Sequence, residues 1–127
     1  MDKRAVETDN APDAVGPYSQ AIKTMGMVFC SGQIPVNPKT GELVKGSIEI
    51  QVKQVMENIA CILDEAGTDL GSVAKTTVFL KDLGNFPVVN EIYGSYFNEP
   101  YPARVTIGVK DLPLGADIEI DAIAVLK

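Results

Sequence analysis

The sequence predicts an α/β (α+β) two-layer sandwich in which two helices cover one face of a mixed six-stranded sheet. Short β-branched or apolar runs recur along the chain, two segments have helical periodicity, and turn residues separate them in the order β-β-β-α-β-α-β-β. Each helix joins two strands that should run parallel, and such crossovers are right-handed. We therefore expect both helices on one side of the sheet and a bare second face.

The N-terminal part of the chain supplies three of the predicted strands. Residues 3–8 and 19–24 are short candidates, separated by a loop that Pro12 and the Gly16-Pro17 pair interrupt. Residues 27–31 are almost continuously apolar, as expected for a strand covered on both faces. Residues 37–41 have the composition of a turn.

Residues 47–66 are the clearest helix, because their apolar side chains recur at spacings of three and four. Ser47 suits its N-cap, and Gly67 suits the position after its last turn. Residues 73–81 favour a central strand. A second helix is expected to begin near Asn85, with the Asn85 side chain as its cap and Pro87 in its first turn.

The last quarter of the chain, residues 102–127, is predicted to be a β-hairpin. Residues 104–110 and 117–121 alternate β-branched and polar side chains on either side of a loop at Pro113. Side chains alternate between the faces of a strand, so a symmetric hairpin would place Arg104 on the same face as Glu119.

The two faces of this hairpin are expected to differ. The face of Arg104 also carries Ile123 and Val125, and such a mixture predicts a half-buried surface that meets another subunit or a ligand. The opposite face, with Val105 and Ile107, is apolar and is expected to lie under the helices.

Length and charge limit the possible functions. The 127 residues fit a single domain, residues 1–127. The net charge of −6 and the scattered positions of the 11 lysines and arginines oppose nucleic-acid binding on electrostatic grounds. No apolar run approaches the ~20 residues of a membrane span, and the N-terminus has no apolar signal segment, so a cytoplasmic location is expected.

The absence of histidine from the sequence narrows the chemistry further. It removes Ser-His-Asp triads, Cys-His dyads and nearly every catalytic zinc site. Cys30 and Cys61 lack metal-site or disulfide spacing and are interpreted as small buried hydrophobic residues. We expect chemistry that uses Arg, Glu, Tyr, Ser, Thr, backbone groups and water, with no metal or cofactor.

Five short runs carry a resemblance to one known family. The runs are GPYSQ at residues 16–20, SGQIP at 31–35, KTTVF at 75–79, PAR at 102–104 and IEI at 118–120. Their order, and the elements between them, resemble those of the RidA/YjgF family, some members of which are labelled endoribonuclease L-PSP or translation inhibitor. The match spans almost the whole chain.

The resemblance implies a chorismate-mutase-like fold, a homotrimer and ligand clefts at the subunit interfaces. It also implies an enzyme that needs no cofactor and hydrolyses reactive 2-imino or enamino acids, such as 2-iminobutanoate and 2-iminopropanoate, to 2-oxo acids and ammonia. In that pattern Arg104 holds the substrate carboxylate, and Glu119 orients or activates the attacking water. The other implied cleft residues are Tyr18, Ser31, Gly32, Asn90 and Thr106, of which Gly32 and Thr106 act through main-chain groups. Many relatives have Cys where this chain has Thr106, so a thiol-dependent property at that position is not expected.

The residue types suit this chemistry for physical reasons. A 2-imino acid is already an activated electrophile, so the enzyme need only orient the substrate and a water and relay a proton. Arginine binds a carboxylate through two directed hydrogen bonds. A positioned glutamate that takes or gives a proton typically contributes ~10²–10⁴-fold to a rate.

The sequence also allows structural roles for the same residues. Arg104 suits an interface ion pair with Glu119 or Asp121, and Glu119 suits a solvated or inter-subunit salt-bridge carboxylate, because structural charge networks imitate active sites. Tyr18 suits a packed loop aromatic, Asn90 suits a support for its own helix backbone, and Ser31 suits a strand-end hydroxyl that bonds to the main chain.

Other functions remain open as well. The first alternative is a non-catalytic trimeric binding module for small carboxylate metabolites. An endoribonuclease or translation inhibitor is a weaker alternative, because the chain is acidic and lacks histidine. A chaperone-like holdase is neither favoured nor excluded by the sequence.

Overall fold

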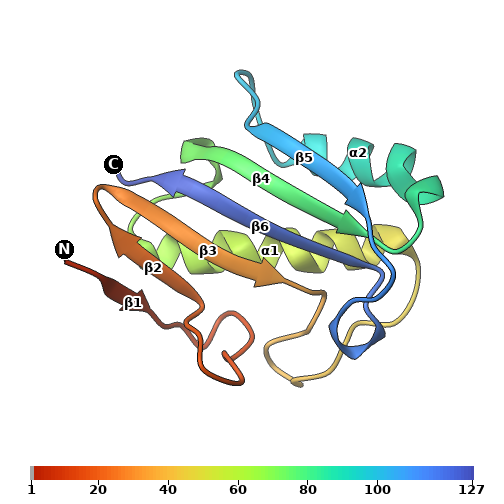
Figure 1. Ribbon diagram of the computed structural model, residues 1–127, viewed down its shortest axis with the longest axis horizontal. Coiled ribbons are helices and arrows are strands. Elements are labelled where there is room, and N and C mark those ends of the chain that lie inside the picture. The colour runs from red at the N-terminus through yellow and green to blue at the C-terminus, as the bar shows by residue number, and fades with distance from the viewer. Residues whose placement is uncertain (1) are drawn as a thin grey trace.

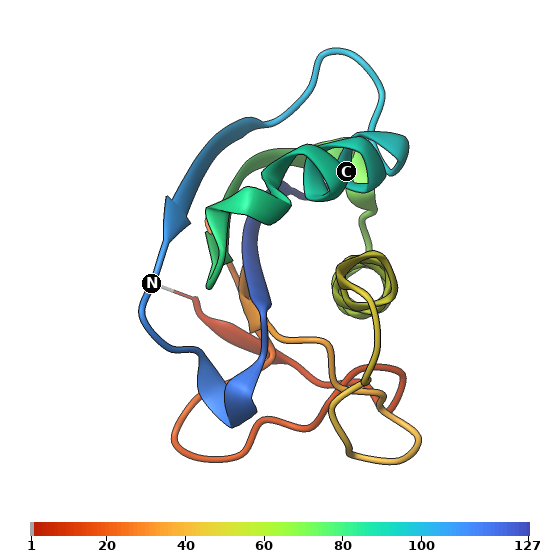
Figure 2. The ribbon, with the colours of Figure 1, turned by 90° about the vertical axis from the view of Figure 1, so that its right-hand side faces the viewer.

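The computed structural model describes residues 2–127 and confirms the predicted order of the elements. The strands are β1 (Arg4–Val6), β2 (Ala21–Thr24), β3 (Met27–Gln33), β4 (Val73–Leu80), β5 (Ala103–Gly108) and β6 (Ile118–Val125). The helices α1 (Ile48–Ala66) and α2 (Phe86–Ser95) lie on the same face of one mixed six-stranded sheet, as predicted (Figures 1 and 2). Short 3-10 helices span Leu70–Ser72, Leu83–Asn85 and Pro113–Gly115.

The order of the strands in the sheet is β1-β2-β3-β6-β4-β5. The predicted terminal hairpin is therefore wrong, because β4 lies between β5 and β6 (Figure 1). The crossover through α2 makes β5 pair in parallel with β4. The chain then carries β6 into the centre of the sheet, where it is hydrogen-bonded to β3 on one side and to β4 on the other.

The register also contradicts the prediction that Arg104 and Glu119 share a face of the sheet. Thr76 in β4 is paired with Arg104, whereas Phe79 is paired with Glu119. Residues paired across strands project on the same side, and residues an odd number of positions apart along a strand project on opposite sides. Because Thr76 is buried beneath α2, Arg104 lies on the helix side and Glu119 on the bare side.

Strand β5 shows the same reversal. Phe79 is also paired with Ile107, so Ile107 projects onto the bare face rather than under the helices as predicted. Val105, two positions earlier, projects with it. Their side chains are 41% and 43% exposed, respectively.

The main helix confirms the sequence prediction at both ends. The Ser47 Oγ accepts a hydrogen bond from the Ile50 backbone N–H at 3.4 Å, and Gly67 ends α1 with a left-handed φ of 93°. The apolar stripe of α1 is fully buried against the sheet, and it includes Val52, Val55, Met56, Ile59, Ile62 and Leu63. Within residues 2–127, neither helix is both long and apolar enough to cross a membrane.

The start of α2 differs from the prediction. The Asn85 side chain makes no capping hydrogen bond, although Pro87 does lie in the first turn. The chain enters α2 through the 3-10 helix Leu83–Asn85, so the backbone at Asn85 is already helical. The capping side chain is Asp82 instead, whose Oδ1 accepts a hydrogen bond from the Gly84 N–H at 2.8 Å.

The second face of the sheet carries no helix, as predicted (Figure 2). Its large apolar side chains include Phe29 and Val125, which are 40% and 47% exposed, and the half-buried Ile123. Lys75 and Asp121 lie among them, around a shallow hollow of about 350 Å³. This face combines apolar and charged groups, as the sequence indicated for the surface around Ile123 and Val125.

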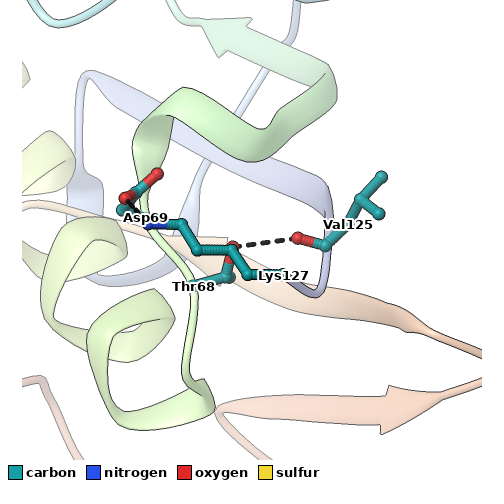
Figure 3. A network of polar contacts seen from close by, with 4 residues as sticks. All are labelled: Thr68, Asp69, Val125 and Lys127. Carbon is teal, nitrogen blue, oxygen red and sulfur yellow. Dashed lines mark hydrogen bonds and ion pairs between the residues drawn. The ribbon is translucent and has the colours of Figure 1, made fainter.

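The C-terminal end of the chain is held by a hydrogen bond and an ion pair to the loop that follows α1 (Figure 3). The Thr68 hydroxyl donates a hydrogen bond to the Val125 carbonyl oxygen at 2.9 Å, and Lys127 forms an ion pair with Asp69. The Leu126 N–H also donates to the Gly26 carbonyl oxygen at 2.9 Å. These contacts fix the end of the central strand β6 to two different parts of the chain.

Candidate active site

Arg104 is exposed near the start of β5 and is held by side chains of α2. Its Nη1 donates a hydrogen bond to the Asn90 Oδ1 at 2.7 Å. Its guanidinium carbon lies 5.2 Å from the ring centroid of Phe86 and 5.0 Å from that of Tyr93. Among residues 2–127, no carboxylate forms an ion pair with Arg104. The guanidinium is thus positioned by neutral groups and keeps its positive charge for a ligand.

Asn90 has a different role from the structural one that the sequence left open. It lies on the exposed surface of α2 and accepts the hydrogen bond from Arg104 rather than supporting the helix backbone. Thr106 lies two residues after Arg104 and is half-buried. The Thr106 Oγ1 is buried without a hydrogen-bond partner in the described chain.

Glu119 lies in a second group of candidate residues, on the bare face of the sheet. Strand β3 has an irregular register between Cys30 and Gln33, and Gly32 lies within this bulge. A Cβ atom at Gly32 would lie 2.9 Å from the Glu119 carboxyl carbon and still closer to one of its oxygens. Gly32 therefore permits the carboxylate to rest directly against the backbone of β3.

Glu119 titrates in an unusual environment. Burial first, and the negative charge of Asp121 second, raise the pKa of Glu119 above its ordinary value. Asp121 itself has a structural role, because its Oδ1 accepts a hydrogen bond from the Thr77 N–H at 2.9 Å. A carboxyl group with a raised pKa is suited to exchanging a proton with water or with a leaving amine.

Tyr18 and Ser31 lie near Gly32 rather than near Arg104. Tyr18 is 52% exposed, and it lines a hollow of about 480 Å³ together with Gly32, Gln33 and Leu114. Tyr18 is thus an exposed pocket residue and not a packed loop aromatic.

The Ser31 hydroxyl is engaged with the main chain. Its Oγ donates a hydrogen bond to the Ser19 carbonyl oxygen at 2.6 Å, and the Ser31 N–H donates to the Gln20 carbonyl oxygen at 2.9 Å. This is the strand-end role that the sequence left open for Ser31.

The candidate residues therefore form two groups that do not meet within one chain. The first group is Arg104, Asn90 and Thr106; the second is Tyr18, Ser31, Gly32 and Glu119. The β-sheet register separates Arg104 from Glu119 by three positions along the strands and by two strands. These offsets correspond to roughly 10 Å in each direction, in addition to the opposite faces.

Of the residues that hold Arg104, the sequence prediction included Asn90 but not the aromatic rings. Phe86 and Tyr93 lie in the predicted second helix, and Thr76 lies in a predicted strand, but none of the three was a candidate site residue. The signal was present, because residues 86, 90 and 93 are spaced by four and three and share one helix face. That Arg104 packs on this face follows only from the β4–β5 pairing.

The charged groups of residues 2–127 do not converge as metal ligands would. Within the described residues, no three Cys, Asp or Glu side chains lie together in a way that could hold a metal ion. The two groups instead offer a fixed cation, a carboxyl group of raised pKa and exposed main-chain atoms.

Comparisons with known proteins identify the family of the chain. The family described as Endoribonuclease L-PSP matches residues 8–126. A RutC family protein of Pyrococcus abyssi is 52% identical over 124 residues, which cover 98% of each chain. The chloroplastic Reactive Intermediate Deaminase A of Arabidopsis thaliana is 52% identical over 124 residues, covering 98% of this chain and 66% of that protein.

A solved structure shares the fold as well. The crystal structure of E. coli TdcF with bound serine is 40% identical, has a TM-score of 0.92, and matches 98% of this chain and 99% of that one. The family match extends over nearly the whole chain, and the relatives include a protein named as a reactive intermediate deaminase. The chain therefore belongs to the endoribonuclease L-PSP family, which is the RidA/YjgF family.

Proposed function

We propose that this protein is a cofactor-independent deaminase that hydrolyses reactive 2-imino or enamino acids, such as 2-iminobutanoate and 2-iminopropanoate, to 2-oxo acids and ammonia in the cytoplasm. Arg104 binds the substrate carboxylate, and Glu119 positions or activates the water. The observation that carries this proposal is the guanidinium of Arg104, which neutral groups hold in place and which no described carboxylate neutralises. Such a group is a ready receptor for a small carboxylate.

The active site in this proposal forms between subunits of a homotrimer. Arg104 and Glu119 lie on opposite faces and two strands apart, so a small substrate cannot contact both within one chain. The edge strand β5 and the bare sheet face are both available for contacts with other copies. We infer that the Arg104 group of one subunit faces the Glu119 group of its neighbour, and that Tyr18 and Gly32 complete the cleft.

The reaction follows from these two groups. The carboxylate of the substrate is fixed by Arg104, which presents the C=N carbon to a water held by Glu119. Starting from the protonated imine, the water adds to this carbon while Glu119 accepts one of its protons, giving a neutral carbinolamine. Glu119 then returns this proton to the nitrogen, and the C–N bond breaks with its electrons on nitrogen while the carbinolamine hydroxyl gives its proton back to Glu119 and becomes the C=O of the 2-oxo acid. Ammonia leaves, and Glu119 releases the last proton to solvent. Water is the only co-reactant, and no electrons are exchanged with another molecule.

The experiment that tests this function generates the imino acid in solution. An amino-acid oxidase produces the 2-imino acid, semicarbazide traps what remains, and the loss of trapped product measures hydrolysis. We expect wild type to accelerate this loss, Arg104→Ala to abolish nearly all of the acceleration, and Glu119→Gln to reduce it by roughly 10²–10⁴-fold. Light scattering on each variant checks that the assembly is unchanged.

A second candidate function, a non-catalytic binding module for small carboxylates, is favoured by one observation. The E. coli TdcF structure contains bound serine, an amino acid with a free carboxylate. The same assay separates the two functions, since a binding module would bind 2-oxobutanoate through Arg104 but leave the rate of imine loss unchanged.

Ribonuclease activity receives less support from this chain than the family description suggests. The net charge of −6 opposes binding to a phosphate backbone, and the sequence contains no histidine for general acid–base cleavage. Salt-sensitive RNA cleavage that Arg104→Ala abolishes would contradict this view.

A further inference from the structure

We propose that the ring of Tyr93, with that of Phe86, is the positioning element that orients the Arg104 guanidinium for a carboxylate ligand. This inference rests on the proposed function of Arg104 as a carboxylate receptor, and it names the residues on which that function depends. Tyr93 is a positioning residue in this proposal, because it acts through Arg104 and does not touch the substrate.

The first step is the way in which the guanidinium is held. Arginine has five N–H donors in the plane of its guanidinium group, and a ligand carboxylate binds at an edge of that plane. The guanidinium carbon lies over the rings of Phe86 and Tyr93, which take up no conventional hydrogen bond, and Asn90 uses one N–H of Nη1. The rings thus restrict the orientation of Arg104 while other N–H groups stay available for a ligand.

The second step is the choice of neutral partners. A protein carboxylate in the same place would fix Arg104 equally well but would compete with the ligand for its N–H groups. Aromatic rings attract the cation through their quadrupole and carry no net charge. The arrangement therefore fixes the position of the guanidinium and leaves its positive charge available, and binding a small carboxylate requires both.

The third step is the rigidity of Tyr93 itself. Tyr93 is 4% exposed, and its ring packs on Phe97 with a centroid distance of 4.8 Å. The Tyr93 hydroxyl lies 2.7 Å from the Thr76 Oγ1, and Thr76 is 1% exposed. Thr76 is also the residue paired with Arg104 across β4 and β5. Thr76 thus helps to fix both the ring of Tyr93 and the strand position of Arg104.

The test measures Arg104 directly. Arg4 is the other arginine of the chain and forms an ion pair with Asp2 that is exposed to solvent, so it serves as an internal reference in a side-chain NMR spectrum. Ring currents should shift the Arg104 guanidinium protons upfield of those of Arg4. In Tyr93→Leu the Arg104 signals should move towards the Arg4 position, whereas Tyr93→Phe, which keeps the ring, should retain most of the shift.

Binding of 2-oxobutanoate, a stable product-type carboxylate, is measured on the same variants. Loss of the ring in Tyr93→Leu should weaken binding by about twofold to thirtyfold, the range expected from cation–π contacts. The affinity of Tyr93→Phe should lie between those of Tyr93→Leu and wild type, because this variant loses only the hydroxyl contact with Thr76. Val89→Ala is the matched control, since Val89 is buried on the same helix but has neither a ring nor a polar group; it should lower stability and leave binding unchanged.

The outcomes separate this inference from the proposed function. If Tyr93→Leu leaves both the Arg104 signals and the affinity at their wild-type values, Tyr93 does not position Arg104. If Val89→Ala weakens binding as much as Tyr93→Leu, the effect is general destabilisation, and the inference is likewise wrong. If wild type neither binds 2-oxobutanoate nor hydrolyses an imino acid, the proposed function fails, and the NMR comparison alone decides the role of Tyr93.

Discussion

Single residues in this protein owe their chemical character to their immediate neighbours. Arg104 is held by neutral side chains, so its positive charge remains available for a ligand. Glu119 is half-buried beside Asp121, so its pKa rises because ionisation is disfavoured. One group is thus suited to holding an anion, and the other to exchanging a proton.

The raised pKa of Glu119 gives a prediction for pH dependence. If ionised Glu119 activates the water, activity is lost as the pH falls through its raised pKa. Asp121→Asn removes the nearby negative charge but keeps an oxygen that can accept from the Thr77 N–H. The acid limb of the pH–rate profile should therefore move to lower pH in Asp121→Asn, and the Glu119 carboxyl ¹³C titration should move with it. An acid limb that stays in place while the ¹³C titration moves would show that another group controls the rate.

Gly32 gives a second prediction at this scale. Its φ lies outside the left-handed region, so the contact with Glu119, and not the backbone, is what requires glycine. Gly32→Ala should displace the Glu119 carboxyl group, reduce imine hydrolysis and lower the free energy of unfolding by about 1–3 kcal/mol. In a Glu119→Ala background the same substitution should cost much less, because the overlapping atoms are gone. Equal costs in both backgrounds, measured by urea unfolding, would contradict the contact.

Among the elements, α2 is the one that both covers the sheet and holds Arg104. Gly94 lies in this helix with open space at its Cβ position and an ordinary helical backbone. Gly94→Ala should therefore raise the free energy of unfolding by about 0.5–1 kcal/mol. Gly67→Ala is the opposite case, since the φ of 93° is strained for alanine, and it should lower stability. Urea unfolding of both variants checks the two signs.

The end of β6 gives a contrast between a buried and an exposed contact (Figure 3). Thr68 is 5% exposed, and its hydroxyl bonds to the Val125 carbonyl oxygen, so Thr68→Val should cost about 1–2 kcal/mol and Thr68→Ser should restore most of that loss. The ion pair between Lys127 and Asp69 is exposed to solvent. Lys127→Ala should leave the urea midpoint almost unchanged, because solvent screens such pairs. A larger effect for Lys127→Ala than for Thr68→Val would reverse this ranking.

At the scale of the whole molecule, the bare sheet face determines whether the two groups of site residues can meet. Ile107 is 41% exposed on this face, whereas Ile50 is 49% exposed on α1, away from it. If copies assemble through the sheets, Ile107→Lys should dissociate the assembly and abolish imine hydrolysis, because it places a charge in an apolar contact. Ile50→Lys is the matched control and should retain both properties. Light scattering gives the mass, and an active monomer would contradict the composite site.

The structure of α1 and the order of the elements were predictable from the sequence because they depend on local information. The periodicity of residues 47–66, the cap at Ser47 and the glycine at position 67 all lie within one segment. The family signature was likewise readable as short runs. These features identified the fold class and the family, and they named the candidate residues of the site.

Strand pairing was not predictable in the same way. Two apolar runs joined by a Pro-containing loop suggested that β5 and β6 pair with each other, but β4 lies between them. A local pattern does not report which distant strand offers the better partner. The incorrect strand pairing also assigned side chains to the wrong faces of the sheet. Side chains alternate along a strand, so a different register moves them to the other face.

The sequence by itself determined the helices, the element order, the family and the chemical nature of Arg104 and Glu119. Only the tertiary structure decided that these two residues lie on opposite faces of the sheet and that the ring of Tyr93, whose hydroxyl contacts Thr76, lies against the arginine. The physical reason is that helices and caps arise from interactions a few residues apart. Sheet order and register arise from the burial of whole strands against partners far along the chain.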